Sequence, residues 1–288
     1  MITSMEAGSP MISMDEILRR ILSFSRGLAE KEIEEFIREK IEEAGSRYGI
    51  VGISGGIDSS TTLALATRAL GKDRVIAVIM PHEGITPEED VEDALSLVRS
   101  LGVKHMLVRV SPACERIKYE LKGQGLILDH KAYGNIIARV RMTTLYAIAN
   151  SVGGLVIGTG DKSELLIGYF TKYGDGGVDI LPLGDLYKTQ VRALGKYLGL
   201  PSRIYEKPSS PRLWPGQTAE GELRMSYREI DTVLYALFEL GMKPDEVKQI
   251  KGIEPSTVDR VMELMRRSEH KRRTPPIAVL SDRAKGLM

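Results

Sequence analysis

The sequence has almost no cysteine, almost no net charge and no long apolar run. Cys114 is the only cysteine, so the chain can form neither an internal disulfide nor a cysteine metal cluster. Lysine and arginine total 40 against 39 aspartate and glutamate residues, a balance that gives no global attraction to nucleic acid or to a membrane surface. No stretch approaches the roughly 18 consecutive apolar residues of a membrane helix. We therefore expect a cytoplasmic protein without nucleic-acid or membrane partners.

The composition that remains is that of an ordinary globular protein. Its 288 residues are 42% hydrophobic and 27% charged, enough for one large core. The first residues lack the charged leader and long apolar run of a secretory signal. We expect a disordered start over residues 1–12 and a single domain over residues 13–288.

Strand and helix patterns alternate along the chain, which predicts an α/β fold. Short apolar, β-branched stretches indicate strands at 48–53, 75–80, 105–110 and 155–157. Helical periodicity indicates helices at 15–24, 30–43, 59–70, 88–101, 135–150, 227–240 and 256–267, and several prolines predict a long loop from about 201 to 215. Such alternation predicts a parallel twisted sheet with helices on both faces, with helical additions at both ends of the chain.

A Gly- and Ser-rich loop lies between the first strand and the next helix. It reads Ser54-Gly55-Gly56-Ile57-Asp58-Ser59-Ser60. Glycines let backbone amides approach a phosphate closely, hydroxyls add donors, and the helix N-terminus adds a positive dipole end. An aspartate beside phosphates makes sense as a Mg²⁺ ligand. The alternative is a structural turn with a capping Asp or Ser. The loop lacks the Gly-Lys-Ser/Thr ending of the common P-loop, so it predicts a different phosphate-binding loop.

This loop resembles the pyrophosphate loop of the N-type ATP pyrophosphatases. The resemblance implies an adenine nucleotide alpha hydrolase-like fold and cleavage of ATP between its α and β phosphates. Further segments are similar to those of ammonia-dependent NAD synthetases: Gly158-Thr159-Gly160-Asp161-Lys162-Ser163-Glu164, Gly168 to Asp179, Leu181-Pro182-Leu183, Lys188 and Ser268-Glu269-His270-Lys271-Arg272. Together they cover residues 48–273. The resemblance implies the last step of NAD biosynthesis, with ATP, deamido-NAD and ammonia as substrates.

The resemblance also assigns roles to particular residues. It implies ATP binding by Gly52, Ile53, Ser54, Gly55, Gly56, Ile57, Asp58, Ser59, Thr159, Lys188 and Ser210. It implies Mg²⁺ binding by Asp58 and Glu164, and binding of deamido-NAD by Arg139, Lys172, Asp179, His270 and Lys271. Two positions depart from the family: many relatives have His near Gly160-Asp161-Lys162, and a family threonine corresponds to Ser209 or Ser210.

The implied chemistry requires an activated carboxylate and a proton acceptor. Attack of the substrate carboxylate on the α-phosphate gives an adenylate, with Asp58 and Lys188 as catalytic residues, and ammonia then displaces AMP. Asp175 or Asp179 in the Gly-rich stretch is the candidate for accepting the proton of ammonium. The residues before the phosphate loop fit two helices and not a glutaminase domain, so we expect free ammonia, or ammonia from a separate partner, as the nitrogen source.

Several alternatives stay open at this stage. The same fold serves tRNA thiolases and the ATPase half of GMP synthetase, and a nucleotide-binding regulatory module without turnover is a further possibility. Arg139 and Arg141 point to different helix faces, and we favour Arg139 as the ligand. The basic run Lys271-Arg272-Arg273 could be a solvated tail. The resemblance implies a homodimer, and the apolar faces of the two N-terminal helices support it because they need a partner surface.

Overall fold

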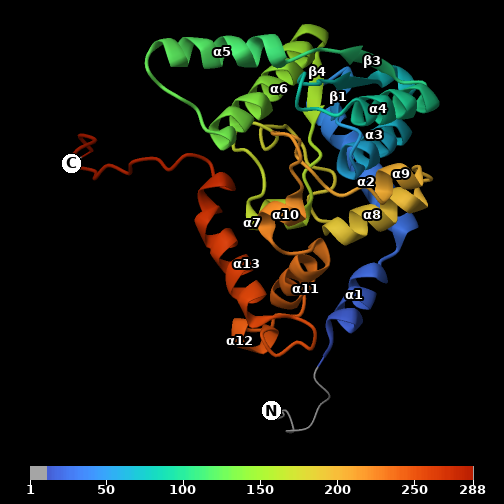
Figure 1. Cartoon of the computed structure of the whole chain (residues 1–288), viewed down its shortest axis with the longest axis vertical. Helices are drawn as coiled ribbons and strands as arrows, with labels where there is room; N and C mark the ends of the chain where they lie inside the picture. Colours follow the sequence, from blue (N-terminus) through green and yellow to red (C-terminus); the bar gives the residue numbers. More distant parts are fainter. Residues whose placement is uncertain (1–11, 288) are drawn as a thin grey trace.

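The computed structural model describes residues 12–287, and residues 1–11 of the expected disordered start lie outside that range. Its centre is a sheet of four parallel strands, β1 (Tyr48–Ile53), β2 (Val75–Ile79), β3 (Lys104–Leu107) and β4 (Gly154–Ile157). The strand order is β3-β2-β1-β4 (Figure 1). The predicted parallel α/β sheet is confirmed, and β1, the strand before the phosphate loop, lies inside it.

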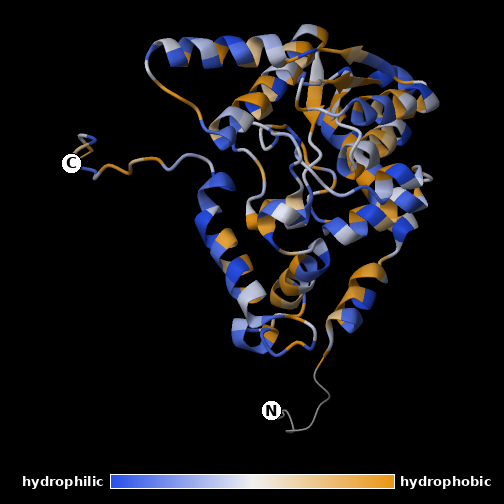
Figure 2. Cartoon of the chain, viewed as in Figure 1, coloured by the Kyte–Doolittle hydropathy of each residue, from blue (hydrophilic) through white to orange (hydrophobic). Residues whose placement is uncertain are grey.

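Helices cover both faces of the sheet, and each face has its own apolar core. On one face, Val51, Ile53 and Ala77 pack with α2 (Arg26–Glu43), α3 (Ile57–Leu70), α4 (Glu88–Leu101) and α8 (Lys188–Tyr197). On the other, Ile50, Ile76 and Val156 pack with α5 (Ser111–Gly123) and α6 (His130–Val152). Consecutive strand residues thus supply opposite faces, as the two-residue period of a strand requires. Figure 2 shows strongly hydrophobic colouring along inner strands of the sheet.

A third core lies away from the sheet and consists of α1 from the start of the chain and of helices that follow β4. Its helices are α1 (Met14–Leu22), α7 (Lys162–Ile167), α10 (Ala219–Leu223), α11 (Tyr227–Phe238), α12 (Pro244–Val247) and α13 (Pro255–Arg267). Ile17 and Ile21 of α1 are fully buried against this core. The predicted helical additions are therefore confirmed, and Figure 1 shows them beside one another at the end of the molecule opposite the sheet.

The two N-terminal helices do not need a partner chain to cover their apolar faces. The apolar side of α1 packs against α11, and Ile37 and Ile41 of α2 are fully buried beside α3. The expectation that these faces await a partner surface is wrong, because other helices of the same chain cover them.

Capping side chains explain why two helices begin before their predicted starts. Ser25 caps α2 by accepting a hydrogen bond from the Leu28 amide, so this helix begins at Arg26. Asp129 caps α6 by accepting from the Ala132 amide at 2.7 Å, so this helix begins at His130 and not at Asn135. The predicted helix 88–101 matches α4 at both ends.

The region after β3 differs most from the prediction. The strand predicted over 105–110 ends at Leu107, although the amides of Val108 and Val110 still bond to the carbonyls of Ile79 and Pro81. Helix α5 begins at Ser111, with Pro112 in its first turn, and was not predicted. This helix has only two buried residues, so its sequence carries little of the apolar periodicity on which the prediction relied.

The predicted Pro-rich loop is largely irregular backbone. After the short helix α9 (Ser202–Tyr205) it continues to α10 without further regular structure. Arg192 of α8 holds its start by donating to the carbonyls of Tyr205 and Lys207 and to the Ser209 hydroxyl. Within residues 12–287, no helix has the length and apolar composition needed to cross a membrane.

Candidate active site

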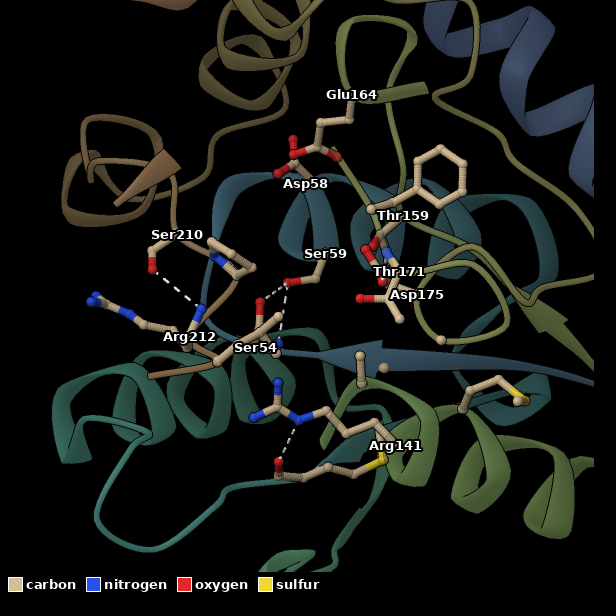
Figure 3. Close-up of a pocket in the computed structure, with 18 of the residues that line it drawn as sticks. Ser54, Asp58, Ser59, Arg141, Thr159, Glu164, Thr171, Asp175, Ser210 and Arg212 are labelled. Carbon is tan, nitrogen blue, oxygen red and sulfur yellow. Dashed lines mark hydrogen bonds between the residues drawn. The ribbon is translucent and has the colours of Figure 1, made fainter. Parts of the chain in front are cut away.

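A cavity of about 450 Å³ opens beyond the carboxyl ends of β1, β2 and β4. The ends of these strands contribute Ile53, Ile79 and Ile157 to its wall, and the loops that follow contribute most of the polar groups. Ligands of parallel α/β sheets bind at this edge. Figure 3 shows Asp58 beside Glu164, the serines of the phosphate loop below them, and Ser210 with Arg212 to one side.

The phosphate loop is held in shape by its own serines. The Ser59 hydroxyl lies 3.1 Å from the Ser54 hydroxyl and accepts a hydrogen bond from the Ser54 amide at 3.2 Å. Gly55 has φ +78°, and a Cβ at this position would lie 2.3 Å from the carbonyl oxygen of Asp90. Gly56 is the N-cap of α3 and provides no side chain, so the first amides of this helix have no side-chain cap. The loop thus leaves backbone donors for an anion, as sequence analysis predicts.

Lys188 stands at the centre of a group of three carboxylates, which we call the lysine cluster. Its Nζ lies 2.7 Å from Asp58 Oδ2, 2.7 Å from Glu164 Oε1 and 2.9 Å from Asp161 Oδ2. The side chains of Lys188 and Asp161 are fully buried, whereas those of Asp58 and Glu164 are 20% exposed. The structure therefore brings together the residues predicted for metal binding and for charge stabilisation.

The lysine cluster has one positive charge for three carboxylates, and this imbalance perturbs its protonation. Burial raises the pKa of Glu164 well above its usual value, although Lys188 opposes the shift. Burial likewise raises the pKa of Asp161 to about 6. For Lys188, burial works against the charged form, but the three carboxylates outweigh it and raise the pKa well above its usual value. The cluster would therefore gain from a further cation.

The carboxylates of the lysine cluster fit a divalent cation that also binds phosphate. Asp58 Oδ1 is buried without a hydrogen-bond partner, so it is free to bind a cation. Within the described part of the chain, no three or more His, Cys, Asp or Glu residues form a complete metal site. Mg²⁺ in nucleotide enzymes takes one or two carboxylates and completes its coordination with phosphate oxygens and water. Asp58 and Glu164 are suited to that arrangement.

A buried aspartate supports the lysine cluster from behind. Asp231 of α11 accepts hydrogen bonds from the Ser163 hydroxyl at 2.5 Å and from the Thr189 amide at 2.8 Å. Ser163 in turn accepts from the Lys188 amide at 2.9 Å. Burial raises the pKa of Asp231 to about 7. These bonds fix the first turn of α8 and hence the backbone from which Lys188 extends.

Three residues predicted to bind the dinucleotide lie in one chain of contacts. The Arg139 guanidinium donates to the carbonyl of Lys172 at 3.3 Å, and the Lys172 ammonium donates to the carbonyl of His270 at 2.6 Å. Lys271 donates to the carbonyls of Gly168 and Phe170 at 2.8 and 2.7 Å and lines the cavity. The basic run at 271–273 is thus tied to the cavity by Lys271 and is not simply a solvated tail.

The two arginines of α6 have different places. Arg141 lines the cavity and donates to the carbonyl of Met80 at 3.1 Å, whereas Arg139 lies outside the cavity wall. Arg141 is a cavity residue, although the prediction selected Arg139. The only sequence signal was that the two arginines, two residues apart, must point to different faces of the helix. Nothing in the described residues assigns Arg139 a ligand, so its role stays a prediction.

The two candidate proton acceptors also differ in position. Asp175 faces the cavity and accepts from the Thr171 amide at 2.8 Å, and the protein around it raises its pKa by removing water. Asp179 lies outside the cavity wall, where it accepts from the Tyr146 hydroxyl at 2.9 Å and from the Val156 amide at 2.8 Å. Of the two, only Asp175 is placed to meet a molecule in the cavity.

Thr159 and Ser210 both line the cavity, on opposite sides of the phosphate loop.

Two residues with a role at the site, Asp161 and Asp231, are absent from the predicted set. Asp161 caps α7 by accepting from the Glu164 amide at 2.8 Å. The spacing Asp-x-x-Glu at a helix start could have indicated the cap. Asp231 lies 42 residues beyond Thr189 and carries no such local signal.

Comparisons with known proteins agree with this site. The family model for NAD synthase matches residues 29–275. A protein named NH(3)-dependent NAD(+) synthetase from Hyperthermus butylicus is 54% identical over 246 residues, 85% of this chain and 88% of the relative. The solved NMN synthetase of Francisella tularensis has a TM-score of 0.78 and 34% identity over 90% of this chain and all of that one. The NH3-dependent NAD synthetase of Campylobacter jejuni has a TM-score of 0.75 and 31% identity, covering 89% of this chain and all of that one.

The matched region contains the phosphate loop, the lysine cluster and the residues at the cavity's edge. The alternative assignments to tRNA thiolases, to GMP synthetases and to a regulatory module without turnover have no support among these relatives. The chain belongs to the NAD synthase family.

Proposed function

We propose that this protein is an ammonia-dependent NAD synthetase, which amidates nicotinate adenine dinucleotide at the expense of ATP. The observation that carries the proposal is a single cavity that joins an uncapped phosphate loop to the buried lysine cluster. Several archaeal relatives of similar length bear the same name, among them a protein from Staphylothermus marinus that is 49% identical over 91% of this chain.

The proposed reaction begins with a poor electrophile. The carboxylate of the substrate repels nucleophiles and has no good leaving group, so it attacks the α-phosphate of ATP and becomes an adenylate while pyrophosphate leaves. The loop amides and the hydroxyls of Ser54 and Ser59 would stabilise the charge that develops on phosphate oxygens. Lys188 would contribute its ammonium from the same side. Ammonia then attacks the activated carbonyl, AMP leaves, and NAD forms.

We propose Mg²⁺ as the cation held by Asp58 and Glu164. Its chemistry there would be to neutralise phosphate charge. The unpaired Asp58 Oδ1 and the excess of carboxylates in the lysine cluster support this assignment.

Asp175 is the proposed acceptor of the proton that ammonium must lose. It faces the cavity, and its raised pKa makes it a better base than an ordinary aspartate. Asp175→Asn is expected to lower the turnover at saturating ammonium while Asp179→Asn changes it less. Equal losses in both variants, or none in either, would contradict this assignment.

A homodimer is proposed because one segment of the chain, α5 with the loop after it, exposes several apolar side chains. Ile117 and Tyr119 of α5 are 41% and 69% exposed, and Leu126 and Ile127 in the following loop are 52% and 85% exposed. Apolar side chains left exposed along one segment favour a protein partner. Among the described residues, the hydrogen bonds of the Arg139 and Lys172 side chains go to backbone carbonyls, so both side chains could also bind groups of a second copy. The cytoplasmic location stays a prediction.

One other substrate deserves a direct comparison. The similarity to the NMN synthetase of Francisella tularensis raises the mononucleotide as a second candidate. Both substrates present the same carboxylate, so the adenylation chemistry does not separate them. The specificity constant for each, measured on one preparation, decides which is the substrate.

The experiment that tests the proposal follows NAD, AMP and pyrophosphate together. Purified protein is supplied with ATP, Mg²⁺, ammonium and nicotinate adenine dinucleotide. Equal amounts of the three products are expected, and Asp58→Asn is expected to abolish them. AMP and pyrophosphate without NAD, or no ATP cleavage at all, would contradict the proposal.

A further inference from the structure

A second group of buried charges lies on the other side of the phosphate loop, and we call it the segment cluster. It contains Lys207 and Arg212 from the Pro-rich segment, Arg203 of α9, and Asp90 and Asp93 of α4. Lys207 Nζ lies 2.9 Å from Asp90 Oδ1 and 2.5 Å from Asp93 Oδ2. Arg212 Nε lies 2.7 Å from Asp90 Oδ2, and Arg203 Nε lies 2.6 Å from Asp93 Oδ1.

The segment cluster has more positive than negative groups. Three cationic side chains share two carboxylates, and both carboxylate side chains are only 5% exposed. Lys207 and Arg212 are largely buried as well, at 12% and 24% exposed, whereas Arg203 is 52% exposed. Lys207 and Arg212 thus balance the two buried carboxylates, and the excess positive charge lies on the half-exposed Arg203. A phosphate beside Lys207 and Arg212 would accept further charge-assisted hydrogen bonds from them.

The two largely buried cations face the phosphate loop across a small pocket. This pocket, of about 50 Å³, has Ser54, Gly56 and Ile57 on one wall and Lys207, Pro208 and Arg212 on the other. It shares Ser54, Asp58, Asp90, Ser209, Ser210 and Arg212 with the large cavity, so the two are continuous. Arg203 lines neither pocket. Figure 3 shows Arg212 and Ser210 across from Ser54.

The backbone of the Pro-rich segment, the predicted loop from about 201 to 215, has an unusual conformation at Arg212. Arg212 has φ +50°, a left-handed conformation that costs a non-glycine residue about 1–2 kcal/mol. Its amide donates to the Ser210 hydroxyl at 3.2 Å, and the next amide, of Leu213, donates to the Gln217 side chain at 2.9 Å. Such conformations persist where the surrounding structure requires them, and they are common at ligand sites.

We propose that Lys207 and Arg212 form a second wall of the phosphate site and bind the two outer phosphates of ATP, then the pyrophosphate product. This inference rests on the proposed function, because it assumes that ATP is cleaved between its α and β phosphates. The loop amides and the two cations contact the outer phosphates from opposite sides. Asp90 and Asp93 keep the cations in position while the site is empty of anion.

The test measures the binding of inorganic pyrophosphate and of AMP, each with Mg²⁺, by calorimetry on the full chain. Lys207→Gln and Arg212→Gln remove a charge but can still donate to the aspartates. Each is expected to weaken pyrophosphate binding at least about tenfold, the loss of one charge-assisted hydrogen bond. AMP lacks the outer phosphates, so its affinity is expected to change less than about twofold. Arg203→Gln is the matched control, since it also loses a bond to Asp93, and it is expected to change neither affinity.

Three results would overturn the inference. They are unchanged pyrophosphate affinity in both variants, a parallel loss of AMP affinity, or an equal loss in Arg203→Gln. If a glutamine variant does not fold, Lys207→Arg replaces it, because it keeps the positive charge, and it is expected to bind pyrophosphate within about threefold of the unaltered protein. A tenfold loss there contradicts the proposal. Failure of the proposed function is distinguishable, because it shows in the unaltered protein, which would then not form NAD, AMP and pyrophosphate in equal amounts, and not as a difference between variants.

Discussion

The lysine cluster and the segment cluster lie on two sides of one phosphate loop and have opposite charge imbalances. In the first, a single ammonium faces three carboxylates. In the second, three cations face two carboxylates. The proposed metal ion would relieve the buried negative excess of the first cluster, whereas the positive excess of the second lies on the half-exposed Arg203 and leaves Lys207 and Arg212 to face the proposed phosphates. The comparison teaches that the charged side chains which each cluster turns toward the cavity indicate which ligand group is expected beside it.

The largest expected effect comes from removing the Asp58 carboxylate of the lysine cluster, whose Oδ1 has no hydrogen-bond partner. Asp58→Asn removes the proposed metal ligand and is expected to lower kcat on the order of 10³-fold. Asp185→Asn is the matched control, because that carboxylate also pairs with a lysine, Lys162, but is 97% exposed. Activity is measured over a range of Mg²⁺ concentrations. A modest loss that is independent of Mg²⁺ would leave Asp58 as a structural partner of Lys188 and nothing more.

Removing the cation of the lysine cluster tests its charge imbalance directly. Lys188→Met leaves three carboxylates without their ammonium and is expected to lower kcat on the order of 10²-fold. It is also expected to lower the free energy of unfolding by about 3–5 kcal/mol at pH 8. Part of that loss should be recovered with Mg²⁺, or at pH 5, where the carboxyls with raised pKa values are protonated. A loss that neither Mg²⁺ nor acid reduces would mean that packing, and not charge, is what the methionine disturbs.

Asp231 gives a smaller effect on activity and a distinct pH dependence. Burial raises the pKa of Asp231 to about 7 in the folded protein, from about 4 in the unfolded chain. Between these values the folded state binds more protons, so stability falls as pH rises from about 4 to 7 and then levels off. Asp231→Asn cannot ionise and is expected to lose this decline, which is at most on the order of 4 kcal/mol. Chemical denaturation at several pH values measures it.

The same variant is expected to lower kcat about tenfold, because Asp231 positions the turn that carries Lys188 and does not face the ligand itself. The KM for ATP should change little. A pH profile of stability identical to that of the unaltered protein would show that Asp231 is ionised throughout and would refute its raised pKa.

An ion pair outside both clusters sets the smallest expected effect. Arg20 pairs with Glu16 at 2.8 Å, and the side chains are 49% and 42% exposed. Arg20→Ala is expected to change the free energy of unfolding by less than about 1 kcal/mol and to leave kcat unchanged, since solvent screens such pairs. Thermal unfolding and the product assay check both values. A larger change would contradict the view that solvent screening makes this exposed ion pair weak.

Much of the fold could be predicted from the sequence because its signals are local. The apolar runs of the inner strands, the glycine-rich loop and the periodicity of α4 each lie within a few residues. The edge strand β3 and the exposed helix α5 bury little, so their patterns are weak: the predicted strand is too long, and the pattern predicts no helix at α5. The predicted fold and family are confirmed, including the phosphate loop between β1 and α3.

The site could be predicted only in part, because its contacts join distant parts of the chain. Resemblance selected Asp58, Glu164 and Lys188, and the structure brings these three together across 130 residues. No local pattern indicated that Lys207 would meet Asp90, 117 residues before it. The metal ligation, the dinucleotide contacts and the proton acceptor stay predictions.

Gly55 lets the backbone of the phosphate loop lie directly against α4. Because a side chain there would collide with the backbone of Asp90, the loop rests directly on the helix that carries both carboxylates of the segment cluster. A displacement of α4 is therefore expected to displace the loop, and an anion that orders the loop is expected to order the start of α4. The absence of a Cβ at Gly55 therefore sets the distance between the two walls of the proposed phosphate site.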